Sequence, residues 1–409
     1  MAVEVRTVRE EELDAFITSM SVAFLEHLPT DGVAELLARV WDLDRTRAAF
    51  DGDTIAGTFR SWPTELTVPG GGRLETAAIA GVTVRPTHRR RGVLRRMLTA
   101  EHAAIRERGE VAGILYASEY PIYGRFGYGV GCRRATWTLS TPATRFVVES
   151  TGSIELVEPS GAARDQLIAV FDAWRVQQPG EIRRRPFTWD MDTGLKETPW
   201  DPRWKGWIAL HRDARGDVDG YARYRAEQKW ERSQPQGALL VDDLHALTDD
   251  AYVSLWRFLA EVDWITTVKA ERRPPGERLP WLLSNGRAAE VSNVSDGLWM
   301  HIFDIPRAME ARAYEREGSI VVEVVDPDPT ARPERLHLDV SLDGARCRPT
   351  DRSPDLTIGA AALGAAYLGG TPLRDAAIAA GLNEHRAGAA AELEALLRTA
   401  AEPWCSTFF

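Results

Sequence analysis

Residues 81–98 read GVTVRPTHRRRGVLRRML and form the most informative segment of the chain. A run rich in β-branched residues stops at Pro86, passes through a loop dense in arginine, and enters a segment in which Leu94, Met97 and Leu98 share one helical face. A strand that leads through such a loop into a helix points backbone N–H groups and the positive end of the helix at one place.

The arginine-rich loop therefore predicts a binding site for a phosphate or pyrophosphate group. Guanidinium groups donate paired hydrogen bonds to phosphate oxygens, and Gly92 would let the backbone approach such a ligand without a Cβ in the way. Two other interpretations stay open on these residues alone: a solvated basic loop, or a nucleic-acid patch over residues 85–96.

The chain has 409 residues, with 50 Lys and Arg against 60 Asp and Glu, and a formal net charge of -10. At about 150 residues per domain, this length predicts roughly two to four domains. The acidic balance argues against a general nucleic-acid binder and allows cationic substrates. The cysteines, Cys132, Cys347 and Cys405, are too scattered for a disulfide framework or a metal site, as expected in a reducing compartment.

The N-terminal segment MAVEVRTVREEEL alternates charged and apolar residues and lacks the apolar core of a signal peptide. No stretch approaches the roughly 18 uninterrupted apolar residues of a membrane span. The eight histidines follow no metal-ligand spacing. We therefore expect a cytoplasmic protein without a membrane partner or a bound metal.

Composition and patterning divide the chain into three blocks, 1–150, 151–303 and 304–409. The first block alternates helical spacing of apolar residues with strand-like runs, two of which meet at a glycine-rich turn. Its expected helices cover residues 10–26, 31–40 and the segment from Val93, and its expected strands cover residues 53–62, 66–84 and 111–117.

The second block repeats this order more loosely and is interpreted as a divergent copy of the first. Where the first block has its arginines and glycine, the second reads TDDAYVSLWRFL at residues 248–259. Aspartates stand there where an anion site needs arginine and glycine, so no second cofactor site is expected. The third block is rich in alanine and leucine and is expected to end in a helix over about residues 385–400.

Two motifs resemble those of GNAT N-acetyltransferases. The run Val82-x-Val84-x-Pro86-x-x-Arg89-Arg90-Arg91-Gly92-Val93-Leu94 resembles the acetyl-CoA signature Gln/Arg-x-x-Gly-x-Gly/Ala, with Leu94 as a departure at the final small position. The run YGRFGY at residues 123–128 resembles the Tyr-x-x-x-Gly-Phe/Tyr motif. Within GNATs, the run SEYPIYGRFGYG from Ser118, the chain length and the terminal WCSTFF resemble the Eis (enhanced intracellular survival) family.

The resemblance implies an α/β chain with two fused GNAT folds followed by a sterol-carrier-protein-like domain. Residues 1–150 would form the catalytic GNAT domain with the acetyl-CoA site, and residues 151–303 a degenerate GNAT domain that shapes the substrate pocket. Residues 304–409 would form the sterol-carrier-like (SCP2-like) domain, which delivers the C-terminal carboxylate. The resemblance also implies a homohexamer.

For the co-substrate, acetyl-CoA, the resemblance implies a site built around the arginine-rich loop. The pyrophosphate would bind the N–H groups of residues 90–95, and the pantetheine arm would pair with the preceding backbone like an added strand. The expected cofactor-binding residues are Val82, Thr83, Val84, Arg89, Arg90, Arg91, Gly92, Val93, Leu94 and Arg95, with Ser118 and Glu119 completing the wall.

Transfer of an acetyl group from a thioester to an amine needs a proton donor for the departing thiolate. The resemblance implies that Tyr123 is this general acid. A phenol with a pKa near 10 is protonated at neutral pH and a thiol has a pKa of about 8.5, so the transfer is feasible in a tuned site. Tyr128 is the competing phenol, and a tyrosine that only packs a turn is the alternative.

No histidine or carboxylate cluster presents a general base, and His88 in the basic loop is expected to face the cofactor or solvent. The resemblance implies instead that the C-terminal carboxylate of Phe409 is the base. The tail WCSTFF, residues 404–409, is too aromatic to suit a chain end in water. If it folds back onto the first block, desolvation would raise the pKa of that carboxyl group. A tail buried for stability or subunit contact is the alternative.

The expected function is the acetylation of primary amines by direct transfer from acetyl-CoA. The resemblance implies acceptors such as aminoglycosides and polyamines, with lysine side chains as a further class. Glu26 on the first helical segment is the candidate for attracting such cations, although a solvated glutamate is the simpler interpretation. The alternative function is a non-catalytic regulator or scaffold that binds acetyl-CoA. Neither function needs a nucleic-acid partner.

Overall fold

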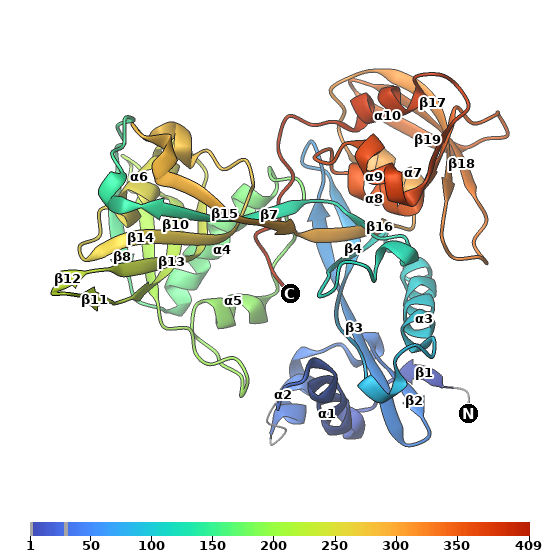
Figure 1. The fold of residues 1–409 in the computed structure, drawn as a ribbon, viewed down its shortest axis with the longest axis horizontal. Coiled ribbons are helices and arrows are strands. Elements are labelled where there is room, and N and C mark those ends of the chain that lie inside the picture. The colour runs from blue at the N-terminus through green and yellow to red at the C-terminus, as the bar shows by residue number, and fades with distance from the viewer. Residues whose placement is uncertain (1–2, 28–31) are drawn as a thin grey trace.

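The structure, a computed structural model, describes residues 3–27 and 32–409. The chain folds into three lobes, each built on one main sheet (Figure 1). Most of the first lobe is blue to cyan in Figure 1, most of the second is green to yellow, and the third is orange to red. Within the described residues, no helix is both long and apolar enough to cross a membrane.

The first lobe contains strands β1 (Glu4–Thr7), β2 (Thr46–Asp51), β3 (Thr54–Thr67), β4 (Arg73–Val84), β5 (Ala112–Tyr116), β6 (Gly129–Val130) and β16 (Leu298–Ile302), with helices α1 (Leu13–Phe24), α2 (Val33–Val40) and α3 (Val93–Glu107). Its strand order is β1-β2-β3-β4-β5-β16-β6. Among the described strands of this sheet, only the neighbours β4 and β5 run parallel. Apolar side chains of α3 pack on one face of this sheet. The helices and strands expected in this block are confirmed, whereas β1, β2 and the short β6 are not among the expected strands.

The second lobe contains strands β7 (Arg133–Ser140), β8 (Ser153–Val157), β9 (Trp207–Arg212), β10 (Val218–Glu227), β13 (Gly237–Ala246), β14 (Ile265–Arg273) and β15 (Ala289–Asp296), a ribbon of β11 (Trp230–Glu231) and β12 (Gln234–Pro235), and helices α4 (Gly161–Arg175), α5 (Pro186–Asp192) and α6 (Asp249–Ala260). The main sheet has the order β15-β7-β14-β13-β10-β9-β8. β13 and β14 are parallel and α6 connects them. This repeats the arrangement of β4, α3 and β5.

The third lobe contains strands β17 (Gly318–Val325), β18 (Glu334–Ser341), β19 (Gly344–Pro349), β20 (Leu356–Gly359) and β21 (Leu382–Glu384), with helices α7 (Ile305–Ala311), α8 (Ala360–Ala366), α9 (Leu373–Ala380) and α10 (Ala389–Leu397). Its strand order is β19-β18-β17-β20-β21. The helix expected over about residues 385–400 is shorter than predicted, because Gly388 at φ 85° caps α10 at its N-terminus.

Two strands connect the first two lobes. β7 lies before residue 150 but pairs in the second sheet, between β15 and β14. β16 comes after the whole second lobe but returns to the first sheet, between β5 and β6. The division at residues 150 and 303 stays a prediction, while the sheets themselves exchange strands across the first two blocks.

The third lobe packs tightly on the first sheet. One continuous core includes Ile114 and Met300 of that sheet together with Leu363 of α8. Gly129 of β6 lies so close to α8 that a Cβ there would stand 1.9 Å from the carbonyl oxygen of Ala361. Only glycine allows this approach. The third lobe therefore has a fixed position on the first sheet, and the C-terminal tail starts from that position.

Candidate active site

β4 and β5 part before β4 ends. The two strands pair as far as Ile79 on β4 and Leu115 on β5, while β4 continues to Val84 against β3. Among the described residues, the backbone of residues 82–84 therefore has one edge without a strand partner. An extended ligand can hydrogen-bond to such an edge as an added strand.

The loop between β4 and α3 ends at Gly92, which caps the helix. Gly92 has φ 77°, a left-handed backbone conformation that residues with a Cβ disfavour, and none of the described side chains caps the first turn of α3. The N–H groups of that turn are therefore open to a ligand. These are the groups that the sequence assigned to the pyrophosphate.

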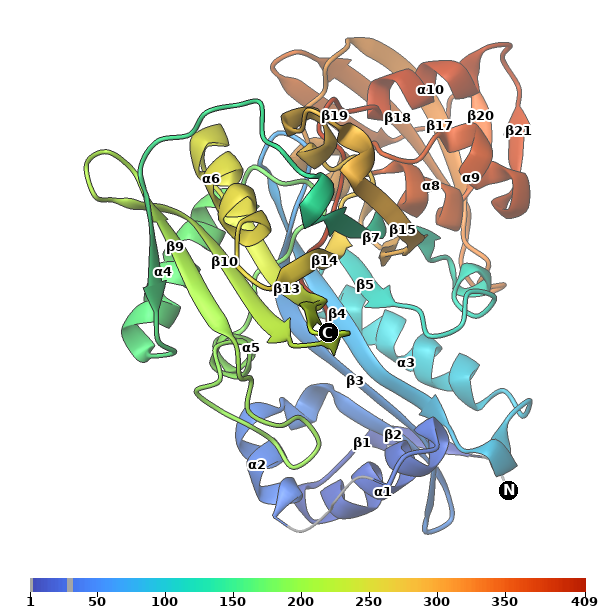
Figure 2. The ribbon, with the colours of Figure 1, turned by 60° about the vertical axis from the view of Figure 1, so that its left-hand side comes forward.

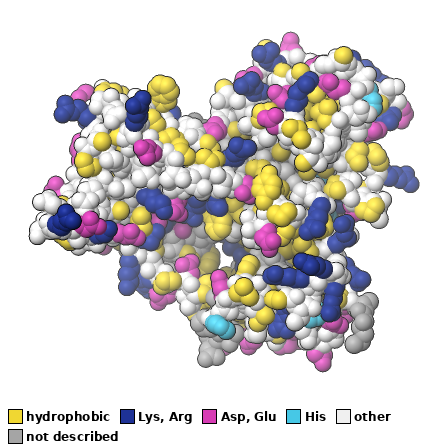
Figure 3. Space-filling model, viewed as in Figure 1, with side chains coloured by type: hydrophobic (Ala, Val, Ile, Leu, Met, Phe, Trp, Pro, Cys, Tyr) yellow, Lys and Arg dark blue, Asp and Glu magenta, His cyan; other side chains and the backbone are white. Residues whose placement is uncertain are grey.

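The arginines of this loop reach into solvent. Arg89, Arg90, Arg91 and Arg95 are all exposed, and Figure 3 shows Lys and Arg side chains gathered over α3 and its N-terminal end. Their positive charge adds to the positive end of the helix, so a phosphate group is favoured at this point.

The start of α6 in the second lobe carries acidic side chains, in contrast to the arginines at the start of α3. Asp249 and Asp250 lie in its first turn, and the Thr248 hydroxyl accepts a hydrogen bond from the N–H of Ala251 at 3.1 Å. Asp250 in turn accepts a hydrogen bond from the N–H of Thr151 at 2.8 Å. The chain's own side chains occupy this helix N-terminus, so it does not suit an anion.

The other predicted residues lie on further segments of the first lobe. Ser118 and Glu119 follow the carboxyl end of β5 and are exposed. His88 places its Nε2 atom 3.4 Å from the Asp51 carboxylate, next to the arginine-rich loop. Glu26 follows α1 and its side chain is exposed, as a solvated glutamate would be.

Tyr123 is buried beneath the loop that follows β5. Its side chain is 5% exposed and packs with Val93, Met97 and Leu115 in the core under α3. Burial raises the pKa of its phenol to about 12, and the Glu119 carboxylate adds to this effect. None of the described residues forms a hydrogen bond with its hydroxyl. The phenol is therefore protonated at neutral pH, and its hydroxyl is available to hydrogen-bond to a ligand.

Tyr128 belongs to a buried network instead. Its hydroxyl lies 3.1 Å from Nε2 of His102, and its ring packs edge-on against His301. His301 in turn places its Nε2 atom 3.1 Å from the Asp326 carboxylate. Burial raises the pKa of the Tyr128 phenol well above its usual value. Because its hydroxyl is engaged inside the core, Tyr128 is less suited than Tyr123 to donate a proton to a ligand.

The C-terminal tail leaves the third lobe and runs between the other two (Figures 1 and 2). Trp404 is buried, its backbone N–H donates to the carbonyl of Pro179 at 2.9 Å, and its indole N–H donates to the carbonyl of Arg272 at 2.7 Å. The Glu402 carboxylate accepts a hydrogen bond from the N–H of Gly276 at 2.8 Å. The second lobe thus holds the tail along its course.

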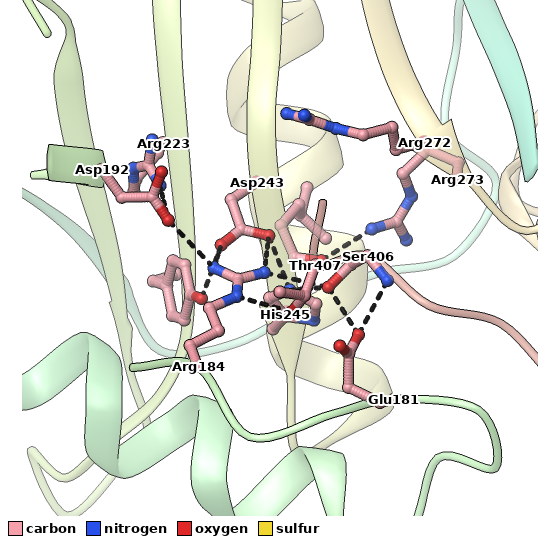
Figure 4. Close-up of polar contacts among 12 residues, drawn as sticks. Glu181, Arg184, Asp192, Arg223, Asp243, His245, Arg272, Arg273, Ser406 and Thr407 are labelled. Carbon is pink, nitrogen blue, oxygen red and sulfur yellow. Dashed lines mark hydrogen bonds and ion pairs between the residues drawn. The ribbon is translucent and has the colours of Figure 1, made fainter. Parts of the chain in front are cut away.

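Glu181, Arg184 and Asp243 of the second lobe form what we call the tail clamp (Figure 4). The Glu181 carboxylate accepts hydrogen bonds from the N–H and the hydroxyl of Ser406 at 2.8 and 2.6 Å. The Arg184 guanidinium donates to the hydroxyl oxygens of Ser406 and Thr407, both at 2.9 Å, and to Asp243 at 2.5 Å. Every polar side chain near the end of the tail is therefore held.

The clamp is a buried charged group. Burial alone would lower the pKa of the Arg184 guanidinium, but the Asp243 carboxylate raises it well above its usual value. Burial would likewise raise the pKa of Asp243, but Arg184 and His245 hold it well below its usual range. Both groups are charged at neutral pH, so Arg184 makes charge-assisted hydrogen bonds to the tail, which are stronger than neutral ones.

Phe409 is docked against the first sheet. Its ring packs edge-on against Trp62 of β3, with 5.2 Å between ring centroids, and against Tyr116 of β5 at 5.1 Å. The Tyr116 hydroxyl donates to the carbonyl of Thr407 at 2.6 Å. Tyr116 is the last residue of β5. The end of the tail therefore lies where β4 and β5 part.

Tyr123 and Phe409 pack in cores on opposite faces of the first sheet. Tyr123 packs in the core that contains Leu115, whereas Phe409 packs against the core that contains Trp62 and Ile114. Ile114 and Leu115 are neighbours on β5, so their side chains point to opposite faces. A ligand that passes through the gap between β4 and β5 can meet the phenol on one side and the terminal carboxylate on the other.

A cavity of 1090 Å³ lies elsewhere, between the loop after β5 and the third lobe. Its lining includes Tyr120, Trp299, Ile358 and Ala376 but neither the arginine-rich loop nor Phe409. Cavity volume alone therefore does not locate the candidate active site, which is defined by the strand edge, the helix N-terminus and the docked tail.

The sequence did not identify Trp62, Tyr116 or the tail clamp. Thr407 lies 291 residues after Tyr116 and 223 residues after Arg184. No local pattern connects positions so far apart along the chain. The aromatic character of the tail was the only signal, and it indicated burial without indicating the partner.

Comparison with known proteins agrees with this architecture. Residues 4–131 and residues 180–310 each match an acetyltransferase (GNAT) domain family, and residues 305–406 match a sterol carrier protein domain family. An uncharacterized N-acetyltransferase of Streptomyces griseus is 38% identical to this chain over 423 residues, with 100% of both chains covered.

Two relatives bear the same family name. The N-acetyltransferase Eis of Mycobacterium tuberculosis is 34% identical over 352 residues, which cover 84% of this chain and 80% of that protein. The crystal structure of Eis1 from Mycobacterium abscessus is similar with a TM-score of 0.86 and 30% identity, covering 100% of both chains. The chain therefore belongs to the Eis family of GNAT N-acetyltransferases and is an N-acetyltransferase with two GNAT domains and a C-terminal sterol-carrier-like domain.

Proposed function

We propose that this enzyme moves the acetyl group of acetyl-CoA directly to a primary amine, with Tyr123 as general acid and the terminal carboxylate of Phe409 as general base. The amine nitrogen bonds to the acetyl carbon, and the bond from that carbon to the CoA sulfur breaks. The carboxylate takes a proton from the amine, and the Tyr123 phenol gives its proton to the departing sulfur. Exchange with solvent restores both groups.

The docking of Phe409 at the carboxyl end of β5 carries this proposal. A tail buried only for stability would have no reason to end where the two parallel strands part. Tyr123 packs on the opposite face of the same sheet. The acid is thus on the side of α3 and of the CoA sulfur, and the base on the side from which the amine approaches.

Acetyl-CoA, the co-substrate of GNAT acetyltransferases, fits the open features of the first lobe. In the proposed complex, the pantetheine arm pairs with the free edge of Val82, Thr83 and Val84, where a backbone N–H also polarises the acetyl carbonyl. The pyrophosphate lies over the N–H groups of residues 90–95, with Arg89 to Arg91 around it. Ser118 and Glu119 at the end of β5 complete the wall.

The acceptors proposed from the family are aminoglycosides, polyamines and lysine side chains. A cytoplasmic location and a homohexameric assembly are also proposed, the first from the composition of the chain and the second from the family.

The proposed function is tested by CoA release from acetyl-CoA across a panel of primary amines. We expect turnover of at least one amine, and we expect the double variant Arg90→Ala, Arg91→Ala to raise the KM for acetyl-CoA about 10- to 100-fold with kcat nearly unchanged. Contacts to the pyrophosphate, which does not react, stabilise the bound substrate and the transition state equally. Their loss therefore weakens acetyl-CoA binding without slowing the chemical step.

Arg215→Ala, in an exposed turn of the second lobe, is the matched control and should leave both constants unchanged. If acetyl-CoA binds but none of the amines is acetylated, the result favours a non-catalytic regulator or scaffold over the proposed transferase. An unchanged KM for acetyl-CoA in the double variant would contradict the assignment of the pyrophosphate site.

The tail clamp provides a second prediction. Removing both clamped hydroxyls, in the double variant Ser406→Ala, Thr407→Val, should lower kcat about 10-fold and leave the KM for acetyl-CoA unchanged. Each lost hydrogen bond to a charged partner weakens the hold on the tail by about 1.5 kcal/mol or more, while Arg184 keeps its partner Asp243 and the core keeps its charges balanced. Steady-state kinetics and a thermal melt on the same samples separate positioning from unfolding.

Thr399→Val is the control for this variant, because Thr399 precedes the clamped part of the tail. It should match the parent in kcat. A double variant with parental kcat and an unchanged melting temperature would show that the clamp does not position the base.

A further inference from the structure

Arg60 and Arg185 lie against the same tryptophan. The guanidinium carbon of Arg60 is 4.9 Å from the ring centroid of Trp62 and 4.3 Å from that of Trp41, and the guanidinium carbon of Arg185 is 4.2 Å from the ring centroid of Trp62. Both arginines are half-buried. Two like charges are therefore held on an aromatic surface and partly removed from water.

None of the described carboxylates neutralises either guanidinium. Within residues 3–27 and 32–409, no carboxylate forms an ion pair with Arg60 or Arg185, and neither side chain donates a hydrogen bond. This contrasts with Arg183 and Arg184, the neighbours of Arg185, which pair with Glu65 and Asp243. Of these three consecutive arginines, only Arg185 lacks an ion-pair partner among the described residues.

This arrangement is unfavourable without a counter-ion. Burial lowers the pKa of Arg60 to about 9, and the charge of Arg185 adds to the effect. Burial also lowers the pKa of Arg185. Charges that lose hydration are normally paired in folded proteins. An anion bound beside both guanidinium groups would supply the missing partner and relieve their repulsion.

The two arginines border the place where acetyl transfer is proposed. The stem of Arg60 lies against Gly81, where a Cβ would stand 3.3 Å from Arg60 Cγ. The next residue, Val82, begins the free edge of β4. Phe409 packs on Trp62, the ring that both arginines share. The pair therefore lies on the same face of the sheet as the proposed base.

We propose that Arg60 and Arg185 bind an anionic group of the acceptor, so that the preferred acceptors are primary amines that also carry a carboxylate or a phosphate. This inference rests on the proposed function and narrows its substrate class. It favours lysine-like amino acids over aminoglycosides and polyamines, which carry only positive charge. Guanidinium groups donate paired hydrogen bonds to both carboxylates and phosphates.

The surface around the tail is consistent with an acceptor that enters between lobes. Figure 3 shows a hollow between the first lobe, on the side of α1 and α2, and the second lobe, on the side of α4 and α5. The C-terminus lies beside this region in Figure 1. Arg60 comes from β3 of the first lobe, and Arg185 precedes α5 of the second. An acceptor anion held by both arginines would thus contact both lobes.

Matched pairs of amines test the inference with the full-length enzyme. Lysine and cadaverine present the same primary amine with and without a carboxylate, as do phenylalanine and phenethylamine, and phosphoethanolamine and ethanolamine form the phosphate pair. We expect kcat/KM to be at least about 10-fold higher for the amine of each pair that carries a carboxylate or a phosphate. The carboxylate and phosphate pairs together show which anion the site takes.

The variants Arg60→Gln and Arg185→Gln should each lower kcat/KM about 10- to 100-fold for the amine that carries a carboxylate or phosphate, mainly through KM. For the matched amine without that anionic group, kcat/KM should change less than about 3-fold. Arg60→Lys should restore part of the preference. Arg215→Gln, an exposed arginine in the second lobe, serves as the control.

Equal use of both members of every pair, or a preference that neither variant changes, would overturn the inference while leaving the acetyltransferase activity in place. An equal loss of kcat for both members would also overturn it, because the arginines would then serve the terminal carboxylate of Phe409. Turnover of none of the amines would instead overturn the proposed function, and this inference with it.

Discussion

Adding one glycine after Phe409 should lower kcat about 10²- to 10⁴-fold while acetyl-CoA still binds. The extension turns the terminal carboxylate into an amide, which cannot accept a proton from the amine. The rings of Phe409, Trp62 and Tyr116 and the tail clamp remain available to hold the tail in place. The new carboxylate lies one residue further on, where the docked ring no longer positions it.

The measurement is single-turnover and steady-state CoA release, with acetyl-CoA affinity determined separately. Phe409→Leu is the matched control, because it changes the anchoring ring but keeps a terminal carboxylate, and we expect it to lose less than about 10-fold in kcat. If the extended enzyme turns over like the parent, the terminal carboxylate is not the base, and the tail is buried for stability alone.

Replacing Tyr123 with phenylalanine should lower kcat about 10²- to 10³-fold with little change in the KM for acetyl-CoA. The substitution removes only the hydroxyl, which has no hydrogen-bond partner among the described residues. No buried polar group is left unsatisfied, so stability should change by less than about 1 kcal/mol. Steady-state kinetics together with denaturant unfolding of parent and variant check both expectations.

Tyr120→Phe is the control on the same loop, since Tyr120 is 65% exposed, and it should keep parental kcat. Parental activity in the Tyr123 variant would show that this tyrosine only packs the turn. A large loss in stability would show instead that its hydroxyl has a structural role.

The pH dependence of kcat follows from the environment of Tyr123. Burial raises the pKa of its phenol to about 12, so the acid form is present below that pH and is lost only as pH rises through it. Between about pH 6 and pH 10, kcat should therefore show no descending alkaline limb due to this group. A limb that vanishes in Tyr123→Phe would contradict the raised pKa.

Much of the first lobe was predictable because its signals are local. The run from Gly81 to Leu98 combines a β-rich segment, a proline, a basic loop and an apolar helical face within a few turns of chain. The expected helix from Val93 is α3, and Gly92, in a left-handed backbone conformation, caps its N-terminus. The aspartates at the start of α6 were equally informative for the second lobe.

Strand exchange was not predictable in the same way. Nothing in residues 298–302 alone indicates pairing with β5. In that pairing Leu298 lies opposite Tyr116, which comes 182 residues earlier in the chain. The apolar side chains of a buried strand fit many neighbours. The choice between neighbouring sheets depends on the whole packed core, so it appears only in the tertiary structure.

The fold class, the arginine-rich loop, the Tyr123 motif and the burial of the aromatic tail could be inferred from the sequence, because each depends on residues close together in the chain. The position of the end of the tail, and the residues that surround it, appear only once the chain is folded. The tail clamp, the contact of Phe409 with Trp62, and the contacts of Arg60 and Arg185 with the same tryptophan join segments from three lobes. Such contacts depend on how the lobes pack and have no periodic trace in the sequence.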